Sequence, residues 1–162
     1  ALCAAYRLRA TGRPKARRAR PARQLQAAVA ALTGPALAIG VAAVRSGVRW
    51  QPPTSAAART ILVAYLASGA VVEELIWRGP LLLPGGTARR AAIAVLGGCG
   101  FVGTHLRRDG LDGARVHALT TSAWTCATLL GGRLRWPILG HTLYNITVVS
   151  LAPARRPPAD AR

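Results

Sequence analysis

The chain alternates between long apolar stretches and short polar connections. The run from Leu25 to Val44 carries no charge and has the length of a helix that crosses a bilayer. The connections are rich in Pro, Gly and Arg, as loops usually are. Four further apolar segments follow, at Thr60 to Trp77, Ala91 to Leu106, Val116 to Leu130 and Trp136 to Leu151. The pattern predicts an all-α fold, a multi-pass transmembrane helical bundle with about five membrane segments.

The same pattern divides the chain into three parts. Residues 1–24 form a basic arm, residues 25–152 a transmembrane helical domain, and residues 153–162 a polar tail. We expect both ends to be mobile, because they have no apolar face to pack. The absence of methionine, including an initiator, suggests that the chain is a fragment or that its true start lies upstream.

Charge adds a choice between two classes of protein. The 162 residues are 51% hydrophobic, and 22 Lys and Arg against 5 Asp and Glu give a net charge of +17. Such an excess is typical of nucleic-acid binders and of membrane proteins with basic flanks. The arginines lie in the arm and between apolar segments, without interleaved aromatic residues, so we expect the lipid bilayer as a partner and no nucleic acid. The positive-inside rule puts the N-terminal arm in the cytoplasm of a cell-membrane protein, with the "ARR" and "GRLR" loops on the same side.

Three cysteines, Cys3, Cys99 and Cys126, lie far apart without a CxxC spacing. A disulfide framework or structural zinc site is therefore not expected. We predict that they are small buried hydrophobes.

Two adjacent acids occur at the end of one apolar segment, in "VVEELIWRGP". A carboxylate there is costly unless it is paired or used. On a helix Arg78 shares a face with Glu74, one turn away, whereas Glu73 points about 100 degrees aside. We predict that Glu74 pairs with Arg78 and that Glu73 is left unpaired. The simpler alternative is a helix end at the interface, where all three meet water.

Two histidines occur inside apolar segments, His105 in "FVGTHL" and His141 in "GHTLYN". Phe101 precedes His105 by one turn and can limit its rotamers, and Asn145 follows His141 by one turn. A single histidine of this kind is more often a packing residue. We expect His117 to be a loop or helix-start residue without a role. Thr120, Thr121 and Ser122 look like ordinary helix-packing residues.

A glutamate and a histidine together form a sufficient hydrolytic unit, because they can take a proton from water. A second histidine with an asparagine offers donors to a developing oxyanion. Alternatively, Glu73, His105 and His141 could hold a divalent metal such as Zn that activates the same water. The residues leave both mechanisms open, the metal-free one and the metal-dependent one. HExxH and GxSxG motifs are absent.

Three short motifs follow one another in the second half of the chain. "EELIWR" fits EExxxR, "FVGTH" fits FxxxH and "HTLYN" fits HxxxN. In this order, over residues 60–151, the chain resembles the CPBP family, the CAAX-protease and bacteriocin-processing (Abi) group of intramembrane endopeptidases. It differs in its short length and in Trp77, where the family often has Phe.

The resemblance implies a role for each motif residue. Glu73 and His105 would activate the hydrolytic water. Glu74 and Arg78 would support the site from the adjacent helical face. His141 and Asn145 would stabilise the oxyanion or contribute to a metal site.

The resemblance also implies an enzyme, a CPBP-type protease that acts on a peptide or protein substrate at the membrane. A prenylated CAAX tail, a bacteriocin leader and another membrane peptide all remain open as substrates. The alternative is a non-catalytic immunity or partner-binding membrane protein that keeps the family scaffold.

Overall fold

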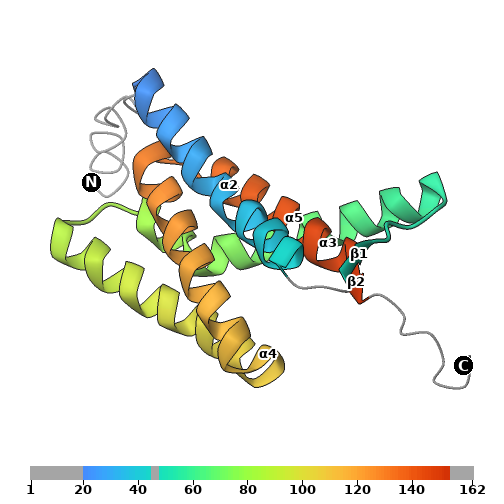
Figure 1. Cartoon of the computed structure of the whole chain (residues 1–162). Coiled ribbons are helices and arrows are strands. Elements are labelled where there is room, and N and C mark those ends of the chain that lie inside the picture. The colour runs from blue at the N-terminus through green and yellow to red at the C-terminus, as the bar shows by residue number, and fades with distance from the viewer. Residues whose placement is uncertain (1–19, 45–47, 154–162) are drawn as a thin grey trace, which may run out of the picture.

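The computed structural model describes residues 20–44 and 48–153 (Figure 1). This part of the chain contains four α-helices: α2 (Pro21–Val44), α3 (Ala56–Trp77), α4 (Thr87–Gly131) and α5 (Arg135–Ser150). A short 3₁₀ helix, η1 (Gly79–Leu82), follows α3. Two three-residue strands, β1 (Val48–Trp50) and β2 (Leu151–Pro153), pair antiparallel. The predicted helical class is confirmed. Within the described residues, the short antiparallel pair of β1 and β2 is the one non-helical element.

The count of about five membrane segments is not confirmed. Two of the four described helices, over Pro21–Val41 and Ala56–Trp77, are long and apolar enough to cross a membrane. The third and fourth predicted segments both lie in α4, as two arms on either side of a kink. Helix α2 begins at Pro21 rather than Leu25, so residues 21–24 of the expected arm are helical. Residues 1–19 of the arm and 154–162 of the tail lie outside the described residues.

The kink in α4 occurs at Gly110, whose φ of 66° and ψ of −170° are non-helical. Residues with a side chain avoid this conformation, and glycine does not. Gly113 is needed as well, because a Cβ there would collide with the side chain of Asp109. Asp109 and Asp112 are therefore part of a tight reversal between two helical arms.

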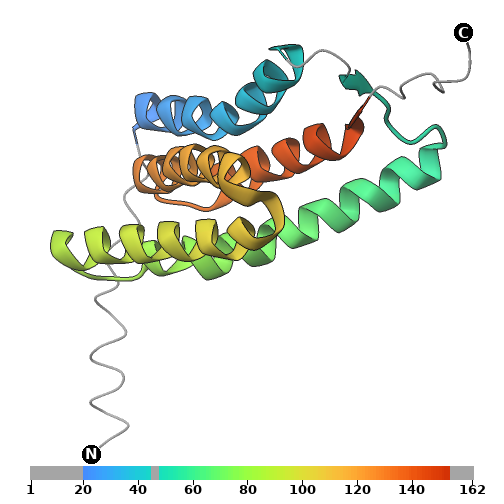
Figure 2. The same cartoon turned by 60° about the horizontal axis from the view of Figure 1, so that its bottom comes forward.

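The helices form three layers, which Figure 2 shows from the side. Helix α2 packs on α4 and α5, and α3 packs on the opposite side of α5. In the view of Figure 2, the second arm of α4 and α5 lie between α2 and a lower layer made of α3 and the first arm of α4. The starts of α2, α4 and α5 lie at one end of the bundle, and the kink lies at the other.

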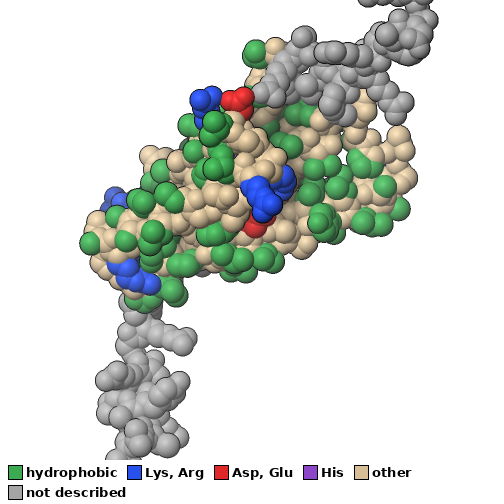
Figure 3. Space-filling model, turned by 90° about the horizontal axis from the view of Figure 1, so that it is seen from below, with side chains coloured by type: hydrophobic (Ala, Val, Ile, Leu, Met, Phe, Trp, Pro, Cys, Tyr) green, Lys and Arg blue, Asp and Glu red, His purple; other side chains and the backbone are tan. Residues whose placement is uncertain are grey.

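The distribution of side chains is inverted relative to a water-soluble protein. The interior contains Glu74, Arg78 and His141 beside Trp124 and Phe101. Large aliphatic side chains face outward instead, including Ile61 (70% exposed) and Leu96 (71% exposed). Figure 3 shows hydrophobic side chains across the face in view, with charged ones in small separate groups. A monomer in water rarely exposes so much apolar surface, whereas lipid tails accept it.

The exposure of the cysteines corrects one prediction. Cys99 and Cys126 are free and exposed, not buried, and Cys3 lies outside the described residues. A small apolar thiol loses nothing by facing lipid, so the burial rule for soluble proteins does not apply to these two positions.

A proline in α2 makes possible a hydrogen bond between α2 and α4. Pro35 has no N–H, so the carbonyl of Ala31, four residues earlier, loses its partner within the helix. The indole Nε1 of Trp124 donates to this carbonyl at 3.2 Å. Gly140 of α5 lies so close to the same carbonyl that a Cβ would collide with it. Trp124 is thereby fixed between α2 and α5, behind the residues described next.

Candidate active site

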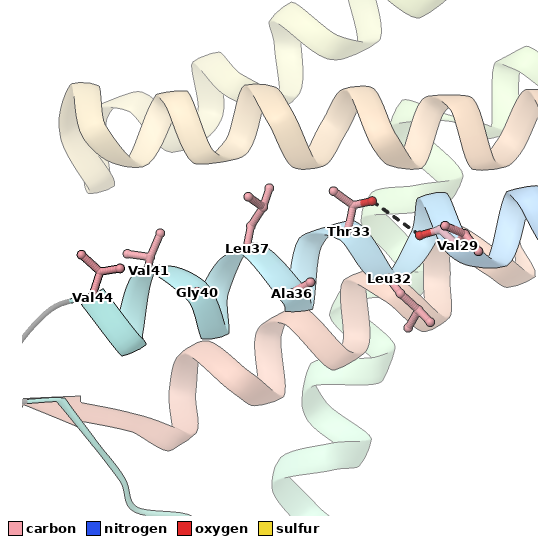
Figure 4. Close-up of a pocket in the computed structure, with 8 residues that line it drawn as sticks. All are labelled: Val29, Leu32, Thr33, Ala36, Leu37, Gly40, Val41 and Val44. Carbon is pink, nitrogen blue, oxygen red and sulfur yellow. Dashed lines mark hydrogen bonds between the residues drawn. The ribbon is translucent and has the colours of Figure 1, made fainter.

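The structure contains two notable hollows. The first, of about 850 Å³, lies along α2 and is lined by Val29, Leu32, Thr33, Ala36, Leu37, Gly40, Val41 and Val44. Figure 4 shows these residues along the helix, with the Thr33 hydroxyl donating a hydrogen bond to the Val29 carbonyl. None of them has an ionisable side chain, and Thr33 is the one polar side chain among them.

The second hollow, which we call the cleft, has a volume of about 880 Å³ and is bordered by α2, α3, α4 and α5. Four of the six predicted site residues line it: Glu73, His105, His141 and Asn145. Glu74 and Arg78 are buried directly behind it, with 0% and 1% of their surface exposed. Residues of all three motifs, from separate helices, thus line or border one cleft.

Glu74 and Arg78 form the predicted ion pair. Arg78 Nη1 donates to Glu74 Oε1 at 2.7 Å, within one turn at the end of α3. The guanidinium lies over the rings of Phe101 and Trp124, at 4.6 and 5.5 Å. Its Nη2 donates to the Thr121 hydroxyl, so Thr121 is a partner of the site rather than an ordinary packing residue. The alternative, a helix end in which these side chains meet water, is wrong for this pair.

His141 is held from two sides. Its Nδ1 lies 2.9 Å from Glu74 Oε1, and a carboxylate in this pair accepts, so Nδ1 carries a proton and donates. The Trp124 indole stacks on the imidazole at 4.4 Å between centroids and 20° between planes. Glu74 therefore has a second task that spacing alone did not reveal: it orients His141 as well as pairing with Arg78.

Glu73 points into the cleft instead. Its side chain is 36% exposed, and Oε2 lies 3.9 Å from Nε2 of His141. Among the described residues Oε2 has no hydrogen-bond partner. Two adjacent glutamates thus have different surroundings, as the turn of about 100° between them predicted.

His105 is oriented by its own helix. Its Nδ1 lies 2.8 Å from the carbonyl oxygen of Phe101, which can only accept, so Nδ1 carries the proton. Nε2 is consequently the unprotonated nitrogen of the neutral ring. The Phe101 ring packs against the imidazole at 4.6 Å between centroids, as predicted. In the described part of the chain Glu73 and His105 line the same cleft without a hydrogen bond between them.

His117 corrects another prediction. It is neither a loop nor a helix-start residue: it lies within the second arm of α4 and is only 6% exposed. Its Nε2 lies 2.9 Å from Asp109 Oδ2, and its ring centroid is 4.2 Å from that of His105. The only signal in the sequence was Gly110 between Asp109 and His117, because their contact depends on the reversal of the chain there.

The three candidate metal ligands are Glu73, His105 and His141. In the ranges 20–44 and 48–153, no three His, Cys, Asp or Glu side chains are grouped closely enough to hold a metal ion together. Glu73 and His141 approach each other to 3.9 Å, while the imidazole beside His105 is that of His117.

Comparison with known proteins identifies the family of the chain. No curated protein and no solved structure matches the chain. The family described as type II CAAX prenyl endopeptidase Rce1-like matches residues 55–147, which is more than half of the chain and includes all six predicted site residues. This match confirms the family predicted from the three motifs. The inverted surface and the apolar helices α2 and α3 fit a protease family of the membrane. The chain belongs to the Rce1-like family of type II CAAX prenyl endopeptidases.

Proposed function

We propose that the chain is an intramembrane endopeptidase in which Glu73 and His105 activate a water for attack on a peptide bond. The observation that carries this proposal is the presence of two free acceptors in one cleft. Glu73 Oε2 has no partner in the described residues, and the tautomer of His105 leaves Nε2 unprotonated. A carboxylate or an imidazole with a free acceptor can take a proton from water, which makes the water nucleophilic at neutral pH.

His141 and Asn145 supply the other half of the proposed mechanism. The hydroxide adds to the carbonyl carbon, and negative charge develops on the carbonyl oxygen. Asn145 offers an amide donor from the cleft wall, and His141 donates from Nε2 when both of its nitrogens carry protons. Glu74 and Trp124 hold the His141 ring in place beforehand, so it does not have to reorient during the reaction. The proton taken from water then passes to the leaving amine, which completes the hydrolysis.

The substrate we propose is a membrane-associated peptide or protein. The cleft volume of about 880 Å³ accommodates several residues of an extended chain. Apolar side chains such as Leu66, Val116 and Val148 line it beside the polar groups, which suits a segment that enters from lipid. A prenylated CAAX peptide and an unmodified membrane-tethered peptide are the two reporters that separate the possible substrate classes.

The test uses purified chain in proteoliposomes with both reporters. Glu73→Gln keeps the size of the side chain and removes its basicity, and His105→Ala removes the imidazole. We expect each to lower cleavage by at least about 100-fold, the usual contribution of a general base. Cys99→Ala, which removes an exposed thiol from the same helix as His105, is the matched control and should cleave at the wild-type rate.

Two outcomes would contradict the proposal. A folded Glu73→Gln variant that retains the full effect of the protein in the cell, whatever its cleavage rate, would indicate a non-catalytic partner-binding protein. For the metal question, we expect activity to survive removal of divalent ions by a chelator, because the described residues present no ready group of three ligands. Loss of activity that Zn²⁺ restores would instead assign Glu73, His105 and His141 to a metal.

A further inference from the structure

One pair of polar residues in the cleft has no part in the mechanism above. Asp109, at the kink, and His117, in the second arm of α4, both line the cleft beside His105. His117 Nε2 lies 2.9 Å from Asp109 Oδ2. A histidine buried at this depth usually serves packing, and its polar atoms then find partners.

The hydrogen bonds of Asp109 determine which ring nitrogen of His117 carries the proton. Arg108 donates to both oxygens of Asp109, from Nε at 2.8 Å and from Nη2 at 3.0 Å. These bonds, together with the one from His117, lower the pKa of the Asp109 carboxyl to about 2, against the opposing effect of its partial burial. An ionised carboxylate only accepts, so the proton of the neutral His117 ring lies on Nε2. Its Nδ1 is unprotonated and buried, without a partner among the described residues.

The ring of His117 lies against that of His105. Their centroids are 4.2 Å apart and their planes meet at 37°. Phe101 contacts His105 at 4.6 Å and 38°, and meets His117 edge-on at 5.8 Å. The His105 imidazole is therefore bounded by two rings and tethered at Nδ1 to the Phe101 carbonyl. Rotation about its side-chain bonds would require one of these neighbours to move.

The chain reversal that creates this contact depends on two glycines. Gly110 adopts the positive φ that turns the helix, and Gly113 leaves room for the Asp109 side chain. Asp109 can therefore reach across to His117 from the end of the first arm.

We propose that Asp109 and His117 are a positioning pair that holds the His105 imidazole in its working orientation. His117 acts through ring contact, and Asp109 acts by fixing the His117 ring and its Nε2–H tautomer. This inference rests on the proposed role of His105.

The test is a comparison of kcat and KM in proteoliposomes. We expect His117→Ala to lower kcat by about 10- to 100-fold, because a small misplacement of a catalytic group has effects of this size. KM should stay within about twofold, because the His117 ring is only 6% exposed and its closest ring contact is with His105. His117→Phe keeps a ring against His105 and should recover most of the lost kcat. Asp109→Asn keeps an acceptor for Nε2 and should remain near wild type, whereas Asp109→Ala should lower kcat.

A double-mutant cycle separates a pair from two independent effects. Asp109→Ala should add almost nothing to His117→Ala, because Asp109 acts only through the imidazole. Arg115→Ala, which breaks the exposed pair between Arg115 and Asp112 in the same segment, is the matched control and should leave kcat unchanged.

Three results would overturn the inference: wild-type kcat in His117→Ala, a loss confined to KM, or losses that multiply in the double variant. If His117→Ala does not fold, Asp109→Ala carries the test, because it leaves the His117 ring in place and should still lower kcat at an unchanged KM. Failure of the proposed function looks different, because His105→Ala would then cleave normally. If His105→Ala is inactive while every His117 and Asp109 variant is fully active, only the positioning pair is wrong.

Discussion

At the scale of single residues, neighbouring glutamates on α3 have contrasting surroundings. Glu74 has no exposed surface and contacts both Arg78 and His141. Glu73 keeps a third of its side chain exposed, although Oε2 of each carboxylate is buried without a hydrogen-bond partner in the described residues. One carboxylate is thus neutralised and used to orient a histidine, and the other is available for chemistry. The division follows from helix geometry together with a buried cation one turn away.

The buried ion pair makes a prediction about stability. Arg78→Met should lower the free energy of unfolding by about 3–5 kcal/mol, because it leaves the Glu74 carboxylate buried without its cation. Combining it with Glu74→Gln should recover most of this loss, since no buried charge then remains. Unfolding in a detergent titration, followed by circular dichroism, measures both variants.

A matched control for Arg78→Met lies on the exposed pair of α4. Arg115 and Asp112 are each 77% exposed, so Arg115→Met should cost less than about 1 kcal/mol. A cost for Arg78→Met no larger than that of the control would contradict the account of a desolvated pair.

At the scale of the elements, α2 matters to the site although it carries none of the motif residues. Pro35 frees the carbonyl of Ala31, and Trp124 uses that carbonyl to anchor its indole. The same indole stacks on His141. An irregularity in the first described helix therefore helps to set the orientation of a site residue in the last one.

This linkage predicts a specific rescue. Trp124→Phe should destabilise the protein by about 1–2 kcal/mol beyond the loss of packing, because the Ala31 carbonyl is left without a donor inside the protein. Pro35→Ala restores an N–H that can bond this carbonyl within α2. We therefore expect Trp124→Phe to cost less in a Pro35→Ala background than in the wild type, measured by the same detergent titration.

The double-mutant cycle removes the effect of ring size, because the smaller ring is present in both backgrounds. An equal cost of Trp124→Phe with and without Pro35 would show that the hydrogen bond to Ala31 contributes nothing.

At the scale of the whole molecule, the two ends of the bundle differ in what they contain. The starts of α2, α4 and α5 share one end, so Arg89, Arg90, Arg133 and Arg135 gather there. The other end carries the kink, with the Asp109 and Asp112 ion pairs beside arginines. An excess of basic residues near membrane ends favours the cytoplasmic side, so we expect the first end to face the cytoplasm.

Single cysteines at the two ends test this orientation. In a background without Cys3, Cys99 and Cys126, a membrane-impermeant maleimide should label Asp112→Cys in intact cells. Arg90→Cys should react only after permeabilisation. Both positions are exposed in the structure, so access through the protein does not limit either reaction. The reverse labelling would place the N-terminal end outside the cell.

Local periodicity and spacing were enough to predict much of this protein. Apolar runs predicted helices that lie close to α2, α3 and α5, because helix formation in an apolar chain is decided by short-range sequence. The i+4 spacings predicted the Glu74–Arg78 pair and the Phe101–His105 contact, since both lie within one turn. The order of the motifs predicted the family.

Contacts between distant segments needed the tertiary structure. The hydrogen bonds from Arg78 to Thr121, from His141 to Glu74 and from Trp124 to Ala31 each join residues far apart in the chain. The reversal between two predicted segments within α4, and the meeting of Asp109 with His117 that it permits, depend on Gly110 and Gly113. The sequence by itself determined which residues are candidates for chemistry, because rare polar groups in an apolar chain have few other reasons to be there. Only the packing of the helices decided which of them touch, because that depends on the angles and close approaches that Gly110, Pro35 and Gly140 permit.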